Sequence, residues 1–209
     1  MIDISAIDFA KSGGLVPAVV QHARTRQVLM LGYMNEAAVR QTIETGQVTF
    51  FSRSKDRLWV KGETSGNTLS LVSVRVDCDR DALLVEAVPA GPVCHLGTTG
   101  CFDDGEAPGV GFLEALASIV RTRREADPKD SYVARLLASG PLKAAQKVGE
   151  EGVEVALAAA AQDDTALKEE AADLVFHLLV ALESRGVAFS DVVETLRTRH
   201  ASSLAITER

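Results

Sequence analysis

The chain has 209 residues, of which 46% are hydrophobic and 24% charged, and its net charge is −7 at pH 7. This length can form one domain or two small ones with separate cores. Nucleic acids and anionic membranes are poor partners for so acidic a chain, because the sequence holds no compensating cluster of Lys and Arg. With no basic and apolar leader and no apolar run long enough to cross a bilayer, we expect a cytoplasmic protein without a membrane partner. Three cysteines cannot all pair, which favours reduced thiols over a disulfide framework.

The first hundred residues have the pattern of short strands and turns. Segments 48–51, 58–61, 69–76 and 82–88 are short, partly alternating and rich in β-branched or aromatic residues, so we predict strands there. One helix is expected between Asn35, which suits an N-cap, and Gly46, which follows its last turn.

Helical spacing replaces this pattern after Cys101. The polar stretch 102–111 holds three glycines and one proline and is typical of a linker. Apolar residues then recur at helical intervals over 111–126, 130–138, 141–162, 165–185 and 189–200. We therefore predict an α+β chain. A small β-rich domain with a few helices would cover residues 1–105, and an all-α helical-bundle domain would cover 106–209.

All three cysteines lie within residues 77–101, together with three alternating aspartates. On an extended strand Asp77, Asp79 and Asp81 would share one face, and Cys78 would point to the other. Three carboxylates on one face repel one another unless water or a cation separates them. The cluster is therefore either a solvated strand end or a site for a hard divalent cation such as Mg²⁺.

The cysteines allow a similar pair of interpretations. Cys78, Cys94 and Cys101 with one water would form an open, catalytic zinc site, whereas structural zinc sites need four ligands. Zinc lowers the pKa of a bound water to about 7, and His95 could then act as a base or orient that water. Alternatively, the thiols are small buried apolar groups. Spacing alone indicates a hydrolytic zinc site and leaves its substrate open.

Longer motifs around these residues carry a family resemblance. The segments are FFSRSKDRLWVKGETSGN at 50–67, DCDRDALL and CHLGTTGCF, with GLVPAVVQ and VLMLGYMNEAA upstream. Together they resemble phosphoribosyl-AMP cyclohydrolase, an enzyme of histidine biosynthesis, over about residues 13–102. The resemblance implies zinc-dependent hydrolytic opening of the adenine ring of phosphoribosyl-AMP, between N1 and C6. It also implies a homodimer in which the cyclohydrolase site is shared between subunits.

The roles that this family implies fall on the residues just described. Its zinc ligands would be Cys78, Cys94 and Cys101. Its Mg²⁺ ligands would be Asp77, Asp79 and Asp81, and His95 would assist the hydrolytic water. Candidate phosphate contacts are Arg53, Lys55 and Lys61, and Trp59 could stack on a base. Each of these last four is also compatible with a surface charge or a core aromatic.

Two helices of the second half place acids beside an apolar stripe. At about 100° per residue, Glu151 lies near the stripe and Glu154 at its edge, while Glu170 and Asp173 fall together on the next helix with His177. Acids in such positions are costly unless a metal compensates for their charge.

Three neighbours of these acids need separate interpretations. Glu150 and Glu169 are expected to face solvent, although Glu150 could join the site. His177 is expected to be a satisfied, partly buried residue near the ligands and not a ligand itself.

The helical half also carries a family resemblance. SYVARLL, QKVGEEGVEVALAA and EEAADLVFHLLVAL resemble phosphoribosyl-ATP pyrophosphohydrolase over about residues 112–200. That family belongs to the all-α, Mg²⁺-dependent nucleotide pyrophosphohydrolases, which implies a set of Mg²⁺ ligands: Glu151, Glu154, Glu170 and Asp173. Lys143 and Lys147, one helical turn apart, are candidate contacts for the triphosphate.

The two halves together predict a bifunctional hydrolase of histidine biosynthesis that acts on small phosphoribosyl nucleotides. The second domain would remove pyrophosphate from 1-(5-phosphoribosyl)-ATP, and the first would open the ring of the resulting 1-(5-phosphoribosyl)-AMP. One alternative joins the cyclohydrolase to a general nucleotide pyrophosphohydrolase. Another is a metal-storage or regulatory dimer without turnover, which the lysines beside the acids disfavour, since storage needs no phosphate contacts.

Overall fold

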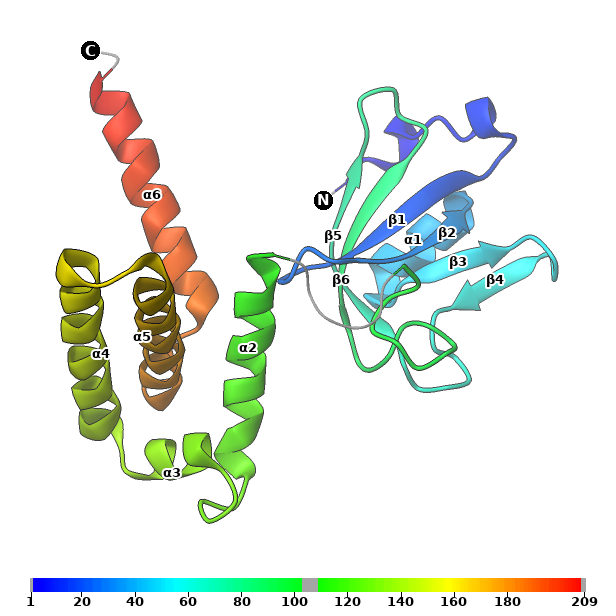
Figure 1. Cartoon of the computed structure of the whole chain (residues 1–209). Helices are drawn as coiled ribbons and strands as arrows, with labels where there is room; N and C mark the ends of the chain where they lie inside the picture. The colour runs from blue at the N-terminus through cyan, green and yellow to red at the C-terminus, as the bar shows by residue number, and fades with distance from the viewer. Residues whose placement is uncertain (1, 103–108, 208–209) are drawn as a thin grey trace. The chain divides into compact units, whose positions relative to one another are not determined.

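The computed structural model describes residues 2–102 and 109–207, which form two compact units (Figure 1). The first unit is Met1–Phe112 and the second is Leu113–Arg209. The predicted boundary between residues 105 and 106 lies outside the described residues, and most of the predicted linker lies there as well. The predicted fold class is confirmed, because a sheet-containing unit precedes a helical one.

A four-stranded mixed sheet organises the first unit. Its strands are β1 (Val16–His22), β2 (Val28–Met34), β5 (Leu69–Val76) and β6 (Leu83–Pro89), in the order β2-β1-β6-β5. The central pair β1 and β6 is parallel, and each pairs with its outer neighbour in antiparallel fashion.

The sequence pattern predicts β5 at its observed bounds and β6 to within one residue, but it does not predict β1 and β2. Pro17 weakens the strand signal of β1, since proline cannot donate to a sheet ladder. The structure accommodates Pro17 because pairing with β6 begins only at Ala18, so Pro17 pairs with Tyr33 of β2 alone.

A helix and a hairpin complete this unit, together with two short 3₁₀ turns, η1 (Ile4–Ala6) and η2 (Ala10–Ser12). Helix α1 (Glu36–Thr45) begins after Asn35, whose side chain accepts a hydrogen bond from the Ala38 amide at 2.8 Å. It ends before Gly46, which has a φ of 69°. The hairpin strands β3 (Thr49–Ser52) and β4 (Arg57–Val60) follow, each one residue away from its predicted start.

The core of the first unit forms where the hairpin meets the sheet. Phe50 of β3 is 1% exposed, and a Cβ at Gly32 of β2 would lie 2.4 Å from its ring. Only glycine therefore lets β3 approach β2 this closely. Trp59 of β4 packs on Phe50, with ring centroids 5.7 Å apart.

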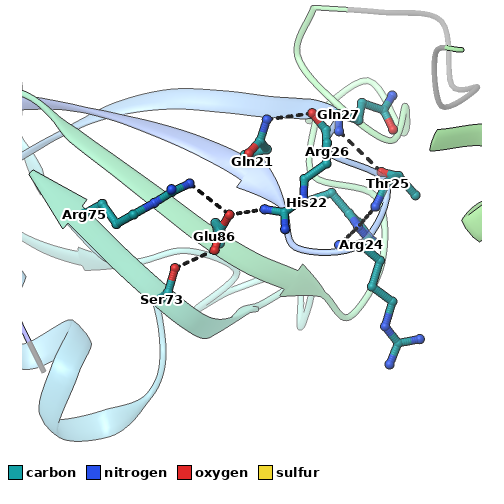
Figure 2. A network of polar contacts seen from close by, with 9 residues as sticks. All are labelled: Gln21, His22, Arg24, Thr25, Arg26, Gln27, Ser73, Arg75 and Glu86. Carbon is teal, nitrogen blue, oxygen red and sulfur yellow. Dashed lines mark hydrogen bonds and ion pairs between the residues drawn. The ribbon is translucent and has the colours of Figure 1, made fainter. Parts of the chain in front are cut away.

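A polar network fixes the turn between β1 and β2 to the neighbouring strands (Figure 2). The Glu86 carboxylate on β6 accepts hydrogen bonds from Ser73 Oγ at 2.6 Å, from Arg75 at 3.2 Å and from Arg26. Ser73 and Arg26 thereby hold the pKa of Glu86 below its usual value. Within the turn, His22 Nδ1 accepts from two backbone amides at 3.1 Å. Burial lowers the pKa of His22, which keeps this nitrogen available as an acceptor.

The second unit is helical. Its elements are α2 (Gly111–Thr122), η3 (Arg123–Glu125), α3 (Tyr132–Ala138), α4 (Pro141–Ala161), α5 (Asp164–Ser184) and α6 (Phe189–Thr207). The first four predicted helical segments match these elements to within two residues, with α2 tightening into a 3₁₀ turn at its end, and α6 extends seven residues beyond the predicted end at residue 200. Helices α4 and α5 are joined by two residues and lie side by side (Figure 1). No helix in the described part of the chain is long and apolar enough to cross a membrane.

An ion-pair clamp ties α2 and the following η3 turn to α5. Glu183 of α5 is 9% exposed and accepts hydrogen bonds from Arg121 Nε at 3.3 Å and from Arg124 Nη2 at 2.9 Å. A buried core of Val120, Leu136 and Val180 joins α2, α3 and α5.

We predict that Glu183→Gln lowers the free energy of unfolding of the helical unit by about 1–2 kcal/mol. This is below the loss for a fully buried pair, because the two guanidinium side chains are 45% and 50% exposed. Denaturant unfolding followed by circular dichroism measures the change. Glu194→Gln is the matched control, since Glu194 forms a solvent-exposed pair with Arg197. Equal unfolding midpoints for the two variants would contradict the clamp.

Candidate functional sites

A cavity of about 560 Å³ in the first unit gathers several of the predicted site residues. Its lining includes Trp59 and Lys61 from the end of β4 and Cys94, His95 and Cys101 from the loop after β6. Lys61 is 8% exposed although it carries a charge. The cavity therefore combines an aromatic face, a buried cation and two thiols.

The loop after β6 holds the two thiols in place. The Cys101 amide donates to the Leu29 carbonyl of β2 at 2.6 Å, and the Cys94 amide donates to the Thr98 carbonyl at 3.2 Å. The Leu96 amide and the Thr98 hydroxyl lower the pKa of the Cys94 thiol, whereas burial and the neighbouring Cys94 raise that of Cys101. This environment favours the thiolate at Cys94.

His95 lies at the edge of the same group. Its Nδ1 is 3.8 Å from the Cys94 sulfur, and its side chain is exposed to the cavity and solvent. This position leaves the imidazole within reach of a water or a substrate held beside the thiols.

Cys78 is separated from the other two cysteines within one chain. It lies in the turn between β5 and β6, whereas Cys94 follows the opposite end of β6. A seven-residue strand extends about 20 Å. Cys78, Cys94 and Cys101 of a single chain are thus not brought together.

The three aspartates converge in a turn and not on one face of an extended strand. In residues 77–82 Asp77 Oδ1 accepts hydrogen bonds from the amides of Asp81 and Ala82, at 3.0 and 3.1 Å. These bonds give Asp77 a structural role and form the turn that follows the end of β5 at Val76.

One carboxylate oxygen from each of Asp77, Asp79 and Asp81 lies within 4.8 Å of the others. Lys11 places its ammonium between two of them, 2.5 Å from Asp79 and 2.7 Å from Asp81. This contact lowers the pKa of Asp79. The turn therefore offers an exposed group of oxygen ligands that already attracts a cation.

Two predicted phosphate contacts are not among the residues that line the cavity. The Arg53 guanidinium lies 4.0 Å above the centre of the Tyr33 ring, and Lys55 is exposed in the β3–β4 turn. The motif GETSGN contributes lining residues that were not predicted, among them Glu63 and Asn67. Both residues belong to the family motif at residues 50–67, and this membership could have identified them from the sequence.

The second unit brings its predicted acids together on α4 and α5. One oxygen from each of Glu151, Glu154 and Glu170 lies within 4.8 Å of the others. Glu151 is buried, Glu170 is partly buried and Glu154 is exposed. Asp173, the fourth predicted ligand, lies outside this group and offers its backbone carbonyl to His177 Nδ1 at 3.0 Å.

The lysines of α4 lie beside these acids. Lys147 Nζ is 2.8 Å from Glu151 and 2.9 Å from Glu150, and these carboxylates raise its pKa. Lys147 in turn lowers the pKa of Glu151, while Glu151 raises the pKa of Glu154 above its ordinary value of 4.5. Lys143 is exposed and donates to Gln146 at 3.0 Å.

Several residues near the acids have the environment that the sequence predicts. Glu150 and Glu169 are exposed, and His177 is buried with hydrogen bonds at both ring nitrogens. The sequence patterns do not predict the contact of Lys11, which is 68 residues from Asp79, or that of Tyr132 with His177.

Comparison with known proteins agrees with both sites. The phosphoribosyl-AMP cyclohydrolase family model matches residues 30–103, and the phosphoribosyl-ATP pyrophosphohydrolase model matches residues 113–200. Histidine biosynthesis bifunctional protein HisIE of Photobacterium profundum is 53% identical over 202 residues, which cover 94% of this chain and 98% of that protein. The protein of the same name from Escherichia coli K12 is 54% identical over 194 residues, covering 93% and 95%.

Fold, sites and matches define a two-domain hydrolase with a separate site in each domain. The chain belongs to the family of bifunctional histidine-biosynthesis enzymes, in which a phosphoribosyl-AMP cyclohydrolase domain is followed by a phosphoribosyl-ATP pyrophosphohydrolase domain.

The raised pKa of Glu154 predicts that the acidic cluster lowers the stability of the folded protein by an amount that depends on pH. A group whose pKa is raised in the folded state contributes stability below its unfolded pKa and loses that contribution as the pH rises through the folded pKa. In metal-free buffer, we expect Glu154→Gln to gain stability over the wild type as the pH rises from 4.5 through that higher pKa. Thermal unfolding at a series of pH values measures the difference. Glu169→Gln, which changes an exposed acid outside the cluster, is the control, and an equal pH dependence in both variants would refute the repulsion.

Proposed function

We propose that the helical domain removes pyrophosphate from 1-(5-phosphoribosyl)-ATP and that the β-rich domain then opens the product's adenine ring between N1 and C6. The observation that carries this proposal is that each family match contains a different set of candidate metal ligands. Oxygen ligands converge on α4 and α5 within residues 113–200, and thiols line the cavity within residues 30–103.

The acids of the helical domain fit Mg²⁺. A hard cation binds carboxylate oxygens, and Glu151, Glu154 and Glu170 already place three of them together at a cost in repulsion. We assign these residues as ligands, with Asp173 joining them through a change of its side-chain rotamer. Mg²⁺ bound there would neutralise phosphate charge and activate a water for hydrolysis. Lys147 and Lys143 would contact the triphosphate, and Lys147 would exchange its carboxylate partners for phosphate oxygens.

The thiols of the β-rich domain fit zinc, a metal that thiolates bind well. We assign Cys78, Cys94 and Cys101 as its ligands, and zinc bound with an open position would supply an activated water. His95 would accept or donate a proton at that water. Trp59 would stack on the base and Lys61 would pair with phosphate, since both line the cavity beside the thiols. Arg53 and Lys55 would reach the substrate only from outside the cavity.

The aspartates of the β5–β6 turn fit a second oxygen-ligated ion. We assign Asp77, Asp79 and Asp81 to Mg²⁺, which would replace the ammonium of Lys11. Such an ion would bind ribose or phosphate oxygens of the substrate.

A homodimer would complete the zinc site. Because Cys78 and Cys94 lie at opposite ends of β6, one chain supplies two neighbouring thiols and a distant third. A two-fold axis that sets two copies antiparallel along this strand would bring Cys78 of one copy to Cys94 and Cys101 of the other. We therefore propose that each cyclohydrolase site is shared between two subunits.

Two alternatives make different predictions about turnover. A general nucleotide pyrophosphohydrolase would cleave ordinary nucleoside triphosphates as readily as phosphoribosyl-ATP. A metal-storage or regulatory dimer would bind ions without turning over either substrate. Assays with phosphoribosyl-ATP, phosphoribosyl-AMP and ATP separate these alternatives from the proposed function.

The two activities should be lost separately. Glu154→Gln removes a charge from the helical cluster, so the rate of pyrophosphate release should fall while the rate of ring opening stays unchanged. Because Glu154 is assigned as a ligand itself, the loss should exceed the roughly 10- to 100-fold that follows when a residue contacting a ligand is removed. Cys101→Ser should show the reverse and should lose most of its zinc, because a hydroxyl stays protonated near neutral pH. Rates are measured spectrophotometrically and zinc by elemental analysis.

His95→Ala is the control for the zinc assignment. It should retain zinc and lose ring opening, since we assign His95 to proton transfer. Loss of zinc equal to that of Cys101→Ser would make His95 a ligand. Loss of both activities in Glu154→Gln would contradict the division of labour.

Subunit complementation tests the shared site. Cys78→Ser and Cys101→Ser should each lack ring opening when purified alone. After the two are mixed, unfolded and refolded together, half of the dimers are mixed and each holds one intact set of ligands, so we expect roughly a quarter of the wild-type activity. Refolded wild-type protein gives the reference rate. An inactive mixture with normal dimers would show that the ligands come from a single chain.

A further inference from the structure

A chain of polar contacts connects three helices of the pyrophosphohydrolase domain. Tyr132 of α3 places its hydroxyl 2.9 Å from His177 Nε2 on α5. His177 Nδ1 lies 3.0 Å from the carbonyl oxygen of Asp173 and 3.4 Å from Oε1 of Glu151 on α4. His177 and Glu151 are 6% and 5% exposed, so these contacts are shielded from solvent.

The partners of the imidazole determine where its hydrogen lies. Both oxygens that face Nδ1 are acceptors, a carbonyl and a carboxylate, so Nδ1 carries a hydrogen. In the neutral ring Nε2 has a lone pair, and the Tyr132 hydroxyl donates to it. The hydrogen bonds therefore run from the Tyr132 hydroxyl to Nε2 and from Nδ1–H to the Asp173 carbonyl, and this N–H dipole also faces the Glu151 carboxylate at 3.4 Å.

Aromatic packing keeps this imidazole in one orientation. The Phe176 ring lies edge-on to it with centroids 5.2 Å apart, and the Tyr132 ring lies edge-on with centroids 6.0 Å apart. Ring rotation would lose both the packing and the two hydrogen bonds, so Nδ1–H stays on the side where the Asp173 carbonyl and the Glu151 carboxylate lie.

Glu151 needs such support more than its neighbours do. It is buried, and it lies within 4.8 Å of the carboxylate oxygens of Glu154 and Glu170, which repel it. Lys147 Nζ contacts the same Oε1 at 2.8 Å, but a phosphate would compete for this exchangeable surface cation. His177 approaches from the core, where a substrate does not displace it.

We propose that Tyr132 and His177 are positioning residues of the pyrophosphohydrolase site, which fix the Glu151 carboxylate in the orientation that a divalent ion requires. The inference rests on the proposed assignment of Glu151 and Glu154 as ligands. His177 acts on the ion through Glu151, and Tyr132 acts through His177. Outer-sphere partners of this kind change metal affinity by about 10- to 100-fold when they are removed.

Paired substitutions of His177 separate positioning from packing. Asn and Leu have the same branched shape, but only Asn retains an N–H close to the position of Nδ1. We expect His177→Leu to weaken divalent-ion binding about 10- to 100-fold and His177→Asn to restore much of it. Tyr132→Phe keeps the ring and removes the hydroxyl alone, so it should weaken ion binding less than His177→Leu does.

Ion binding is measured directly by titrating the full chain with Mn²⁺ and following the electron paramagnetic resonance signal of the free ion. All variants carry Asp79→Asn and Asp81→Asn, so that the titration reports the helical acids. The Mg²⁺ concentration that gives half-maximal pyrophosphate release should rise by the same factor, and excess Mg²⁺ should recover the rate. Glu169→Gln is the control for a charge change at the exposed surface of α5.

Each outcome bears on a different statement. If His177→Leu, His177→Asn and Tyr132→Phe all bind Mn²⁺ like the parent while Glu154→Gln does not, the positioning role is wrong and the metal site stands. If Glu154→Gln also binds Mn²⁺ normally, the proposed metal site itself is wrong. Equal losses in the Asn and Leu variants would show that His177 only fills space. Should His177→Leu fail to fold, the Asn and Phe variants still decide, because weakened binding in Tyr132→Phe supports the role and unchanged binding in both refutes it.

Discussion

Repulsion between neighbouring carboxylates is the constraint that the acidic groups of both units share. Each unit folds so that three acids come within 4.8 Å of one another, which is unfavourable unless a positive charge lies between them. One lysine contacts each group. Lys11 bridges Asp79 and Asp81, whereas Lys147 contacts Glu151 of the helical group and Glu150 outside it. Both contacts raise the pKa of the lysine.

The two domains differ in how firmly they hold these acids. The aspartates lie in a turn that the Asp77 side chain closes, and Asp77 and Asp79 are exposed. The glutamates lie on two packed helices, and the buried His177 lies 3.4 Å from Glu151. A rigid scaffold suits hydrolysis of a flexible triphosphate, because the protein must supply the order that the substrate lacks.

Local sequence signals were sufficient to predict the end of a helix wherever that end depends on a single residue. Asn35 and Gly46 fix both ends of α1, because the side chain of one caps the first amides and the other adopts a positive φ. Pro141 marks the start of α4 in the same way. The same reasoning failed at β1, whose proline is tolerated only because its ladder with β6 starts one residue later. At residues 77–82 the sequence left a strand end and a cation site as alternatives, and the Asp77 side chain forms a turn there.

The sequence by itself determined the family motifs of this protein, the candidate metal-binding side chains within them, and that a β-rich domain precedes a helical one. These features follow from residue types and short spacings, which do not change when the chain folds. Only the tertiary structure decided which of these side chains meet. It separated Cys78 from Cys94 by the length of β6, placed Lys11 between two distant aspartates, and joined Tyr132 to Glu151 through His177. Such contacts depend on strand order and helix packing, and sequence spacing carries no information about either.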